Sequence, residues 1–533
     1  MSSRPLLTVV VPVYNGGDEI VDNVSVIRGA VVAELGEENV ELVVVSDGSI
    51  DGTAERLLET RTPGVRVIHY DRNLGKGYAV KAGALAGRGE WIGLIDADLD
   101  LDPGSLPSYL ATARAEGLDF AIGSKRHPDS LVEYPRARRV ASWCYQQLNR
   151  LLFRLDVRDT QVGLKVFSRR VADEVVPLLI VKRFAFDLEL LAVAASLGFT
   201  RIRELPVRLE YRFTGSGVRS VAVLGALWDT AAIFYRLRIL RTYDRRRLLF
   251  RGGVPEPLPH VAVIGAARGV DYPEIVPSVE DADLVAVVAP GARPAGNWLS
   301  AAVPYFAEPS VAAVVAPSVA PLRGSLRERG AAAVLESRLG VGSRRAGYFP
   351  GNVRIVADHP ADSVVLRRGD YDSTRAVPAD ELVAWLAARG RRTIYTPDTS
   401  LASEPPPLLR PHLAATFAHA RARGTAARRT QGRSLSLATA LSFVPLSAAI
   451  AGVALVAAGN DAGVALLLAY AAALLVSAVH AAVRFQSITV GLVQPFAVAA
   501  SQVAYVAGFV AGMAMPSRGS ASPSSRSQSK RAA

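Results

Sequence analysis

Short apolar runs alternate with longer amphipathic stretches along the first 125 residues of the chain. The apolar runs have the length and the β-branched composition of buried strands: LTVVVPVY, VELVVVSD, VRVIHY, WIGLIDAD and FAIGSK. The stretches between them predict helices at 18–36, 52–60, 76–87 and 104–116. Because strands that alternate with helices form parallel sheets covered by helices, the pattern predicts an α/β layered domain.

Polar clusters follow the ends of four of these strands. In α/β sheets, ligands bind beyond the carboxyl ends of the strands, so the clusters predict a binding site at that edge of the sheet. The clusters are Tyr14–Gly17, Ser46–Ser49, Asp71–Asn73 and Asp96–Asp102.

The last cluster carries aspartates at alternate positions: Asp96, Asp98, Asp100 and Asp102. A strand places residues i, i+2 and i+4 on one side, so the first three can converge on one point. Gathered carboxylates repel one another unless a hard cation lies between them, and Mg²⁺ or Mn²⁺ shared with substrate phosphates is the usual arrangement. The alternative is an acidic turn that ends at Asp102–Gly104.

Changes of composition divide the rest of the chain into further segments. Residues 221–247 have a helical pattern that is apolar at first and basic at its end, which suits either a membrane-surface helix or an ordinary packing helix. A linker rich in Gly and Pro then precedes a second α/β pattern. The expected segments are 1–220, 221–251, 252–434, 435–515 and 516–533, the last being a basic, Ser-rich tail that we expect to be disordered.

Three apolar stretches lie towards the end of the chain. Residues 435–458 and 462–483 have the length and composition of membrane spans. The third, 488–515, contains two glutamines and a proline and also suits an interfacial or re-entrant helix. Two spans and an interfacial third helix keep the basic tail on the side of the first domain, as the positive-inside rule prefers. Since no signal peptide is recognisable, we expect a multi-pass protein of the cell membrane whose first domain is cytoplasmic.

The formal charge is +12, from 61 Lys and Arg against 49 Asp and Glu. Arginines cluster at 136–139 and 235–247, beside apolar helical patterns and without a nucleic-acid motif. The excess predicts contact with an anionic membrane surface and no binding of nucleic acid. Cys144 is the single cysteine, which excludes an internal disulfide and a cysteine-based metal site.

Seven motifs between about residues 7 and 240 occur in the order and spacing of one known family: VVVPVYNGGDEI, VVVSDGSIDGT, RNLGKGYAVKAG, DADLDLDP, GSKR, DTQVGLKVF and FAFDLELL. This part of the chain resembles glycosyltransferase family 2, whose fold is called GT-A. Within the family it looks like the polyprenyl-phosphate sugar transferases, such as the dolichyl-phosphate mannose and glucose synthases. The resemblance implies an inverting enzyme that takes a hexose from a UDP- or GDP-linked donor.

The resemblance implies a donor site built from the first motifs. A divalent cation, Mg²⁺ or Mn²⁺, would bridge the donor diphosphate to Asp96 and Asp98 as a Lewis acid, with Asp100 standing where mannose synthases often have Gln. Asp47 would accept hydrogen bonds from the donor base. Lys76 would meet a donor phosphate, or else it is a solvated lysine at a helix start. The other donor residues that the resemblance implies are Pro12, Tyr14, Asn15 and Ala97.

The implied acceptor is a polyprenyl phosphate. A phosphate is already an anion near neutral pH, so it can attack the anomeric carbon without a protein base, and a single attack inverts that carbon. Cations would hold the acceptor by charge-assisted bonds, and the candidates are Lys125, Arg138, Arg139 and Lys165. A lipid-facing basic patch is the alternative for 136–139. The supporting residues that the resemblance implies are Asp159, Gln161 and Glu189.

Residues 260–434 also resemble this family, but only faintly. The N-terminal part of the family pattern has no counterpart there. Ala289, Pro290 and Gly291 stand where the metal carboxylates would be, so we expect a degenerate, non-catalytic copy. The Gln-x-x-Arg-Trp signature of processive polysaccharide synthases is absent, which favours addition of a single sugar. Two alternatives stay open: transfer to another cell-envelope glycolipid or glycan, which would need a general base, and a non-catalytic membrane scaffold.

Overall fold

The computed structural model describes residues 4–130, 136–181, 185–208, 220–249, 255, 257–266, 270–357, 359–375, 377–379, 381–429 and 442–514. The chain forms two compact units. The N-terminal unit comprises Met1–Leu322 and Ala346–Glu404, and the C-terminal unit comprises Arg323–Arg345 and Pro405–Ala533. Two large sheets divide the N-terminal unit into a first lobe, residues 4–249, and a second lobe, residues 255–322 and 346–404.

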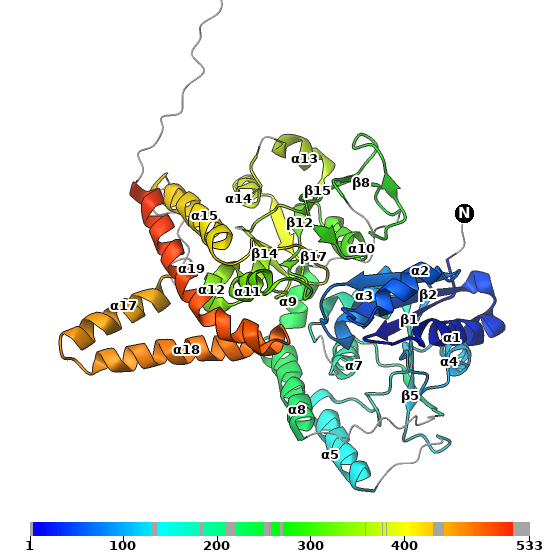
Figure 1. Cartoon of the computed structure of the whole chain (residues 1–533). Coiled ribbons are helices and arrows are strands. Elements are labelled where there is room, and N and C mark those ends of the chain that lie inside the picture. The colour runs from blue at the N-terminus through cyan, green and yellow to red at the C-terminus, as the bar shows by residue number, and fades with distance from the viewer. Residues whose placement is uncertain are drawn as a thin grey trace, which may run out of the picture. The chain divides into compact units, whose positions relative to one another are not determined.

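The first lobe is built on a seven-stranded sheet in the order β3-β2-β1-β4-β6-β5-β7. Figure 1 labels β1, β2 and β5 of this sheet. Its strands are β1 (Leu7–Val13), β2 (Val40–Asp47), β3 (Val65–Tyr70), β4 (Trp91–Leu94), β5 (Phe120–Ser124), β6 (Lys165–Ser168) and β7 (Ile202–Pro206). The five strands predicted from the sequence, β1 to β5, are mutually parallel, and β6 runs antiparallel between β4 and β5. The predicted α/β class is therefore confirmed, with a mixed sheet.

Helices cover both faces of this sheet. They include α1 (Ile20–Leu35), α2 (Thr53–Thr60), α3 (Lys76–Ala86), α4 (Ser105–Ala115), α5 (Arg136–Phe153), α6 (Arg169–Glu174), α7 (Phe186–Ser196), α8 (Ser220–Phe234), η3 (Tyr235–Ile239) and α9 (Thr242–Leu249). Val10 packs with side chains of α3 and α7, whereas Val9 and Val11 pack with side chains of α1 and α4. Because both faces are buried, β1 is a continuous apolar run. The predicted helices match α1 to α4 to within two residues at each end.

The single helix predicted over 221–247 is interrupted. After α8 the chain forms the π-helical turn η3, and α9 begins after Arg241, whose φ of 48° lies in the left-handed region. Tyr243 of α9 is buried in the first lobe, where its hydroxyl donates a hydrogen bond to Glu189. The helix therefore ends where the chain turns to insert Tyr243 into the core.

The second lobe contains another seven-stranded sheet, in the order β14-β16-β12-β15-β10-β8-β9. Its strands are β8 (Val261–Ile264), β9 (Ile275–Val276), β10 (Leu284–Val287), β12 (Val311–Val315), β14 (Arg354–Val356), β15 (Val364–Arg367) and β16 (Arg392–Tyr395), and its helices include α10 (Trp298–Ala302), α13 (Arg368–Thr374) and α14 (Leu382–Ala387). Six strands, β9-β8-β10-β15-β12-β16, have the same order and relative directions as β2-β1-β4-β6-β5-β7 of the first lobe.

A three-stranded sheet, called here the small sheet, completes the second lobe. Its strands are β11 (Arg293–Pro294), β13 (Ser318–Val319) and β17 (Leu401–Ala402), with β17 in the middle.

The C-terminal unit is helical. It contains α11 (Leu326–Leu335), α12 (Arg338–Val341), α15 (Arg410–Arg429), α17 (Val444–Ala457), α18 (Ala462–Arg484) and α19 (Ile488–Ala514), and α17 and α18 form a hairpin (Figure 1). By length and composition α18 and α19 could cross a membrane, with mean hydropathies of 2.3 and 1.6. The described part of the first apolar stretch is α17, which has only 14 residues. The third stretch forms one helix, Ile488–Ala514, over nearly all of the expected range 488–515, and residues 435–441 of the first stretch lie outside the described residues.

The glutamines of α19 face other helices of the C-terminal unit. Gln494 and Gln502 are both buried, and their side-chain nitrogens donate hydrogen bonds to Ser477 Oγ (2.7 Å) and to the Leu339 carbonyl (2.8 Å). Polar side chains that bond across helices are typical of packed membrane helices. Contacts within the C-terminal unit therefore account for the two glutamines of α19, and the choice between a membrane span and an interfacial helix stays a prediction.

Candidate active site

The turns that follow β1, β2, β3 and β4 lie together at one edge of the first sheet. Val13 pairs with Ser46 at the end of β1, and Asp47 pairs with Tyr70 at the end of β2. On the other side of β1, the Ile95 N–H donates to the Val10 carbonyl, at 3.2 Å. The parallel register therefore brings the four polar clusters predicted from the sequence to a common edge.

The turn after β1 is fastened to the turn after β2. Asn15 has a left-handed backbone, with φ of 52°, and its N–H donates to Ser49 Oγ (3.1 Å). The side-chain oxygen of Asn15 accepts a hydrogen bond from the Ile50 N–H (3.0 Å). Beside this turn Tyr14 is exposed and Pro12 is half-buried. These three predicted donor residues thus form one rigid wall at the edge of the sheet.

Asp51 reinforces the same pair of turns, and the sequence analysis did not single it out. Its carboxylate accepts hydrogen bonds from the Gly17 N–H (2.8 Å) and from Thr53 Oγ1 (2.6 Å). Burial on its own raises the pKa of Asp51, but the bonds from Thr53 and Gly17 outweigh it, so the pKa is lowered. The available signal was the position of Asp51, four residues after Asp47 in the motif SDGSIDGT.

Asp47 holds the loop that leads from β3 into α3. Its buried carboxylate accepts hydrogen bonds from the Leu74 N–H (2.7 Å) and the Gly75 N–H (2.9 Å). The neighbouring Gly48 has φ of 67°, and a Cβ there would lie 2.1 Å from the backbone carbon of Arg72. The loop therefore lies directly against the turn after β2. A carboxylate has about four acceptor positions, and the hydrogen bond that Asp47 is expected to accept from a donor base stays a prediction.

Lys76, the first residue of α3, is paired with the first residue of the acidic run. Its Nζ lies 2.5 Å from Asp96 Oδ1. Burial on its own lowers the pKa of Lys76, but the carboxylates of Asp96, Asp187 and Asp98 outweigh it, so the pKa is raised. Lys76 is therefore a permanent cation among three carboxylates rather than a freely solvated lysine.

Gly163 provides the space in which the carboxylate of Asp96 lies. A Cβ at Gly163 would lie 2.2 Å from Asp96 Oδ2, a distance that no real contact allows. Gly163 belongs to the motif DTQVGLKVF, just before β6, the strand that pairs with β4. The role of Gly163 follows from the pairing of β6 with β4. The sequence analysis did not predict it.

The rest of the acidic run forms a turn. Asp98 is exposed, and its Oδ1 accepts a hydrogen bond from the Asp100 N–H (3.1 Å). The carbonyl of Ala97 accepts a bond from the side chain of Asn23 (3.1 Å), which fixes the backbone between the two aspartates. Asp102 accepts a bond from the Gly104 N–H (2.9 Å), so its predicted role in the turn is confirmed.

Asp96 and Asp98 offer the oxygen ligands that Mg²⁺ and Mn²⁺ prefer. Within the described ranges no group of three or more His, Cys, Asp or Glu could hold a metal ion, so Asp100 is not gathered with them as a third ligand. Magnesium in phosphate-transfer sites is commonly held by one or two carboxylates plus substrate phosphates. The donor set therefore fits a cation that is shared with a diphosphate.

The loop of Lys125 is held by Asp159. The carboxylate of Asp159 accepts hydrogen bonds from the Lys125 N–H (3.2 Å) and the Gln161 N–H (3.2 Å). Glu204 accepts bonds from the backbone of Arg158 and Asp159, both at 3.0 Å. These bonds leave the half-buried side chain of Lys125 on a well-defined loop near the end of β5.

Lys165 is enclosed. Its side chain is 1% exposed, and its Nζ donates to Asp187 Oδ1 (2.6 Å) and to the Val162 carbonyl. An acceptor phosphate would have to displace Asp187 to reach it. Arg138 and Arg139 lie in α5, in a stretch whose side chains are outside what the structure describes.

Glu189 has a structural role in the core of the first lobe. It is fully buried, and it accepts hydrogen bonds from the Ile180 and Val181 N–H groups and from the hydroxyl of Tyr243. Burial raises the pKa of Glu189 in spite of these bonds. Its role is to anchor α9 and the segment before α7. Tyr243 was missed by the sequence analysis because its partner lies 54 residues away.

Comparison with known proteins finds similarity to one family in the first lobe. Residues 8–176 match the model of glycosyl transferase family 2. Glycosyltransferase AglD of Haloferax volcanii is 29% identical over 294 residues, which are 55% of this chain and 46% of that protein. Dolichyl-phosphate beta-glucosyltransferase ALG5C of Trichomonas vaginalis is 32% identical over 218 residues, 38% of this chain and 64% of that protein.

A bacterial relative matches a shorter stretch. Dodecaprenyl-phosphate galacturonate synthase of Rhizobium johnstonii is 28% identical over 173 residues, which are 32% of this chain and 49% of that protein. The chain thus spans between 46% and 64% of the length of these three relatives.

Proposed function

We propose that the chain is a glycosyltransferase of family 2, whose model residues 8–176 match, and that it transfers one hexose from a nucleotide diphosphate to a polyprenyl phosphate. The observation that carries the proposal is the Lys76–Asp96 pair at the end of β4, with Asp98 exposed beside it. Two of the relatives are named for dolichyl or dodecaprenyl phosphate, which supports a lipid phosphate as the acceptor.

The proposed reaction is a single displacement. A phosphate oxygen of the lipid forms a bond to the anomeric carbon, and the bond from that carbon to the nucleotide diphosphate breaks. The diphosphate leaves with the electron pair, so no proton has to move and no general base is needed. Asp96 and Asp98 would hold a divalent cation that neutralises the leaving diphosphate when bound. Lys76 adds a fixed positive charge at the same place, since its raised pKa keeps it protonated.

An exposed apolar surface of the first lobe supports an acceptor that comes from a membrane. α5 and α8 pack together through a hydrogen bond between Tyr145 and Thr230 (2.8 Å). Trp143 on α5 and Trp228 on α8 are 56% and 77% exposed. Exposed aromatic side chains of this kind, on helices followed by a basic segment such as η3, are typical of surfaces that enter the interface of an anionic membrane. We propose that this surface, α18 and α19 keep the enzyme at the cytoplasmic face of the cell membrane.

The second lobe supports the proposal of a degenerate copy. Its strands β8, β10 and β15 occupy the places of β1, β4 and β6 in the first sheet. Ala289–Gly291 therefore follow β10 as Asp96–Asp98 follow β4. Val364 pairs with the end of β10 where Lys165 pairs with the end of β4. Without carboxylates at this position the second lobe cannot hold the cation of a donor diphosphate.

Radiolabelled transfer tests the proposal. Membranes that contain the full chain are supplied with a panel of UDP- and GDP-hexoses, polyprenyl phosphate and Mg²⁺ or Mn²⁺, and lipid-linked label is measured. We expect label in the lipid fraction from the wild type, and its loss in the Asp98→Asn variant and in EDTA. Asp102→Asn is the matched control, because Asp102 serves only the turn.

Three outcomes would contradict the proposal. Full activity of Asp98→Asn would refute the assignment of the cation to this run. Label in a glycolipid or glycan, with none in the polyprenyl phosphate, would favour another acceptor, and a failure to bind any nucleotide would favour a scaffold.

A further inference from the structure

We propose that the second lobe positions the donor loop of the first lobe. The candidate active site would then be completed by a lobe that has no metal-binding carboxylates at the equivalent position. The donor loop is defined here as Asp71–Lys76. This inference rests on the proposed function, since it concerns donor binding at the same site.

One side of the donor loop forms part of the candidate site. The Leu74 and Gly75 N–H groups donate to Asp47, and Lys76 is paired with Asp96. The backbone at Arg72 lies so close to Gly48 that no Cβ fits between them. A shift of this loop by a fraction of an ångström would therefore move Lys76 away from Asp96.

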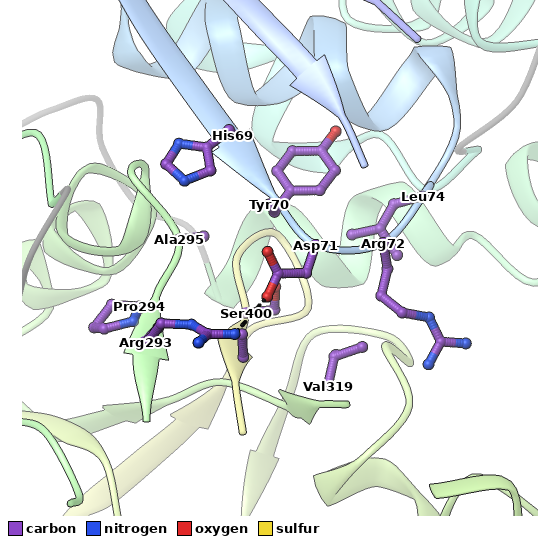
Figure 2. Close-up of a pocket in the computed structure, with 11 residues that line it drawn as sticks. His69, Tyr70, Asp71, Arg72, Leu74, Arg293, Pro294, Ala295, Val319 and Ser400 are labelled. Carbon is purple, nitrogen blue, oxygen red and sulfur yellow. Dashed lines mark hydrogen bonds and ion pairs between the residues drawn. The ribbon is translucent and has the colours of Figure 1, made fainter. Parts of the chain in front are cut away.

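The other side of the donor loop is tethered to the small sheet of the second lobe. Asp71 Oδ2 lies 3.1 Å from an Nη of Arg293, a residue of β11. Figure 2 shows these two side chains facing each other across the gap between the lobes. Arg72 is 3% exposed, and its Nη1 donates to the carbonyl of Ala320, which directly follows β13 (3.1 Å). Two consecutive residues of the loop are thus bound to the small sheet, one to β11 and one to the residue that follows β13.

The helix that continues from the donor loop is held by the second lobe as well. Lys81 of α3 lies 2.8 Å from Asp398, which precedes β17, and Arg246 of α9 lies 3.6 Å from the same carboxylate. All three side chains are buried. Because Lys76 and Lys81 belong to one helix, this cluster fixes α3 five residues beyond the loop.

Polar tethers add to packing in setting the position of the donor loop. A cavity of about 80 Å³ lies between the loop and the small sheet, and its lining includes Tyr70, Asp71, Arg293 and Ser400 (Figure 2). Since this space is not filled by side chains, the Asp71–Arg293 pair is the contact that holds Asp71 against β11 across the cavity. Arg293 is accordingly a positioning residue: it acts on the donor through Asp71 and the backbone of the loop.

Nucleotide binding by the full chain tests the inference. UDP and GDP are titrated in the presence of Mn²⁺ by calorimetry, and the KM values for donor and polyprenyl phosphate and kcat are measured with whichever nucleotide sugar is active. We expect Arg293→Ala to weaken nucleotide binding and to raise the donor KM about two- to fivefold, the range of an exposed ion pair. The KM for polyprenyl phosphate should not change, and Arg293→Lys should restore most of the binding.

A double-mutant cycle links the effect to Asp71. If the tether is the cause, Asp71→Asn and Arg293→Ala together are no worse than either change alone. The matched control is Asp271→Ala, which removes another ion pair between the lobes, with Arg66 on β3, remote from the donor loop. Asp271→Ala should leave nucleotide binding and the donor KM unchanged.

Separate outcomes distinguish failure of this inference from failure of the proposed function. If the wild type binds nucleotide and Arg293→Ala binds it equally well, the inference is wrong while the proposed function stands. Equal weakening of nucleotide binding by Asp271→Ala and Arg293→Ala would also overturn it, because the lobe contact would then be merely structural. If the wild type binds neither nucleotide, the proposed function fails first.

Discussion

The Cβ position of Gly163 lies 2.2 Å from Oδ2 of Asp96. The carboxylate of Asp96 therefore occupies the volume that any larger side chain at residue 163 would need. The two residues come from neighbouring antiparallel strands, since β4 leads into Asp96 and β6 follows Gly163. The orientation of Asp96 towards Lys76 thus depends on a glycine that itself has no functional group.

Gly163→Ala should displace Asp96 without unfolding the first lobe. We expect a 10- to 100-fold loss of transfer activity, the usual effect of disturbing a residue that orients a metal ligand. The concentration of Mn²⁺ that gives half-maximal activity should rise at the same time. Gly29→Ala is the control, because nothing lies within 4 Å of its Cβ position. Normal metal dependence in Gly163→Ala would show that Asp96 has no part in binding a cation.

Lys76→Met should abolish most of the activity while the fold remains. The change removes a fixed cation next to Asp96 and keeps the length of the side chain, so the leaving diphosphate loses one stabilising charge. Removal of one preorganised electrostatic group commonly lowers kcat by about 10²- to 10³-fold. Steady-state kinetics with saturating donor measure the effect, and Lys76→Arg should retain part of the activity. A kcat within twofold of the wild type would leave Lys76 with a structural role only.

The pH dependence of Lys76 follows from the direction of its shift. Its pKa is raised above the ordinary value of 10.5, so the pair with Asp96 makes its full contribution below pH 10.5 and loses it only as the pH rises through the raised value. The ratio of the donor KM of Lys76→Arg to that of the wild type should therefore be constant between pH 7 and about pH 10. A ratio that changes between pH 8 and 9 would contradict the raised pKa.

The local pattern of the sequence predicted the edge of the sheet that carries the candidate site. Buried strands and amphipathic helices are encoded by neighbouring residues, so β1 to β5, α1 to α4 and the polar turns after the strands could be predicted. Gly163, by contrast, meets Asp96 only because β6 inserts beside β4. The ion pair of Asp71 with Arg293 joins residues 222 positions apart, across two lobes. Such contacts depend on how distant elements pack, which residue spacing does not encode.

Lys165 shows how a correct motif can suggest the wrong surroundings. Lys165 belongs to a motif that the resemblance links to the acceptor. This favoured an exposed lysine that could bind the acceptor phosphate. The pairing of β6 with β4 instead buries this lysine, and Asp187 of α7 neutralises it. The burial of a charge cannot be read from its neighbours along the chain, because its partner lies 22 residues away.

Tyr243→Phe should lower the stability of the first lobe. The hydroxyl of Tyr243 donates to the fully buried Glu189, so its removal leaves a carboxylate oxygen without this donor. A buried polar group that loses its partner costs about 1–3 kcal/mol. Thermal unfolding of the full chain in detergent measures the shift, and Tyr235→Phe is the control, since Tyr235 is exposed on η3. Equal midpoints for the two variants would mean that α9 does not depend on this bond.

Trp228→Ser should weaken the use of the lipid acceptor and leave the donor unaffected. Trp228 is 77% exposed on α8, and it contributes apolar surface that would enter the membrane interface. Without it the first lobe docks less often on the bilayer that holds the acceptor, so the KM for polyprenyl phosphate in vesicles with anionic lipids should rise severalfold. Val26→Ser is the control, because Val26 is also an exposed apolar residue, at 51%, but lies on α1. If both substitutions raise this KM equally, or if Trp228→Ser changes the KM for the donor instead, the surface formed by α5 and α8 does not face the membrane.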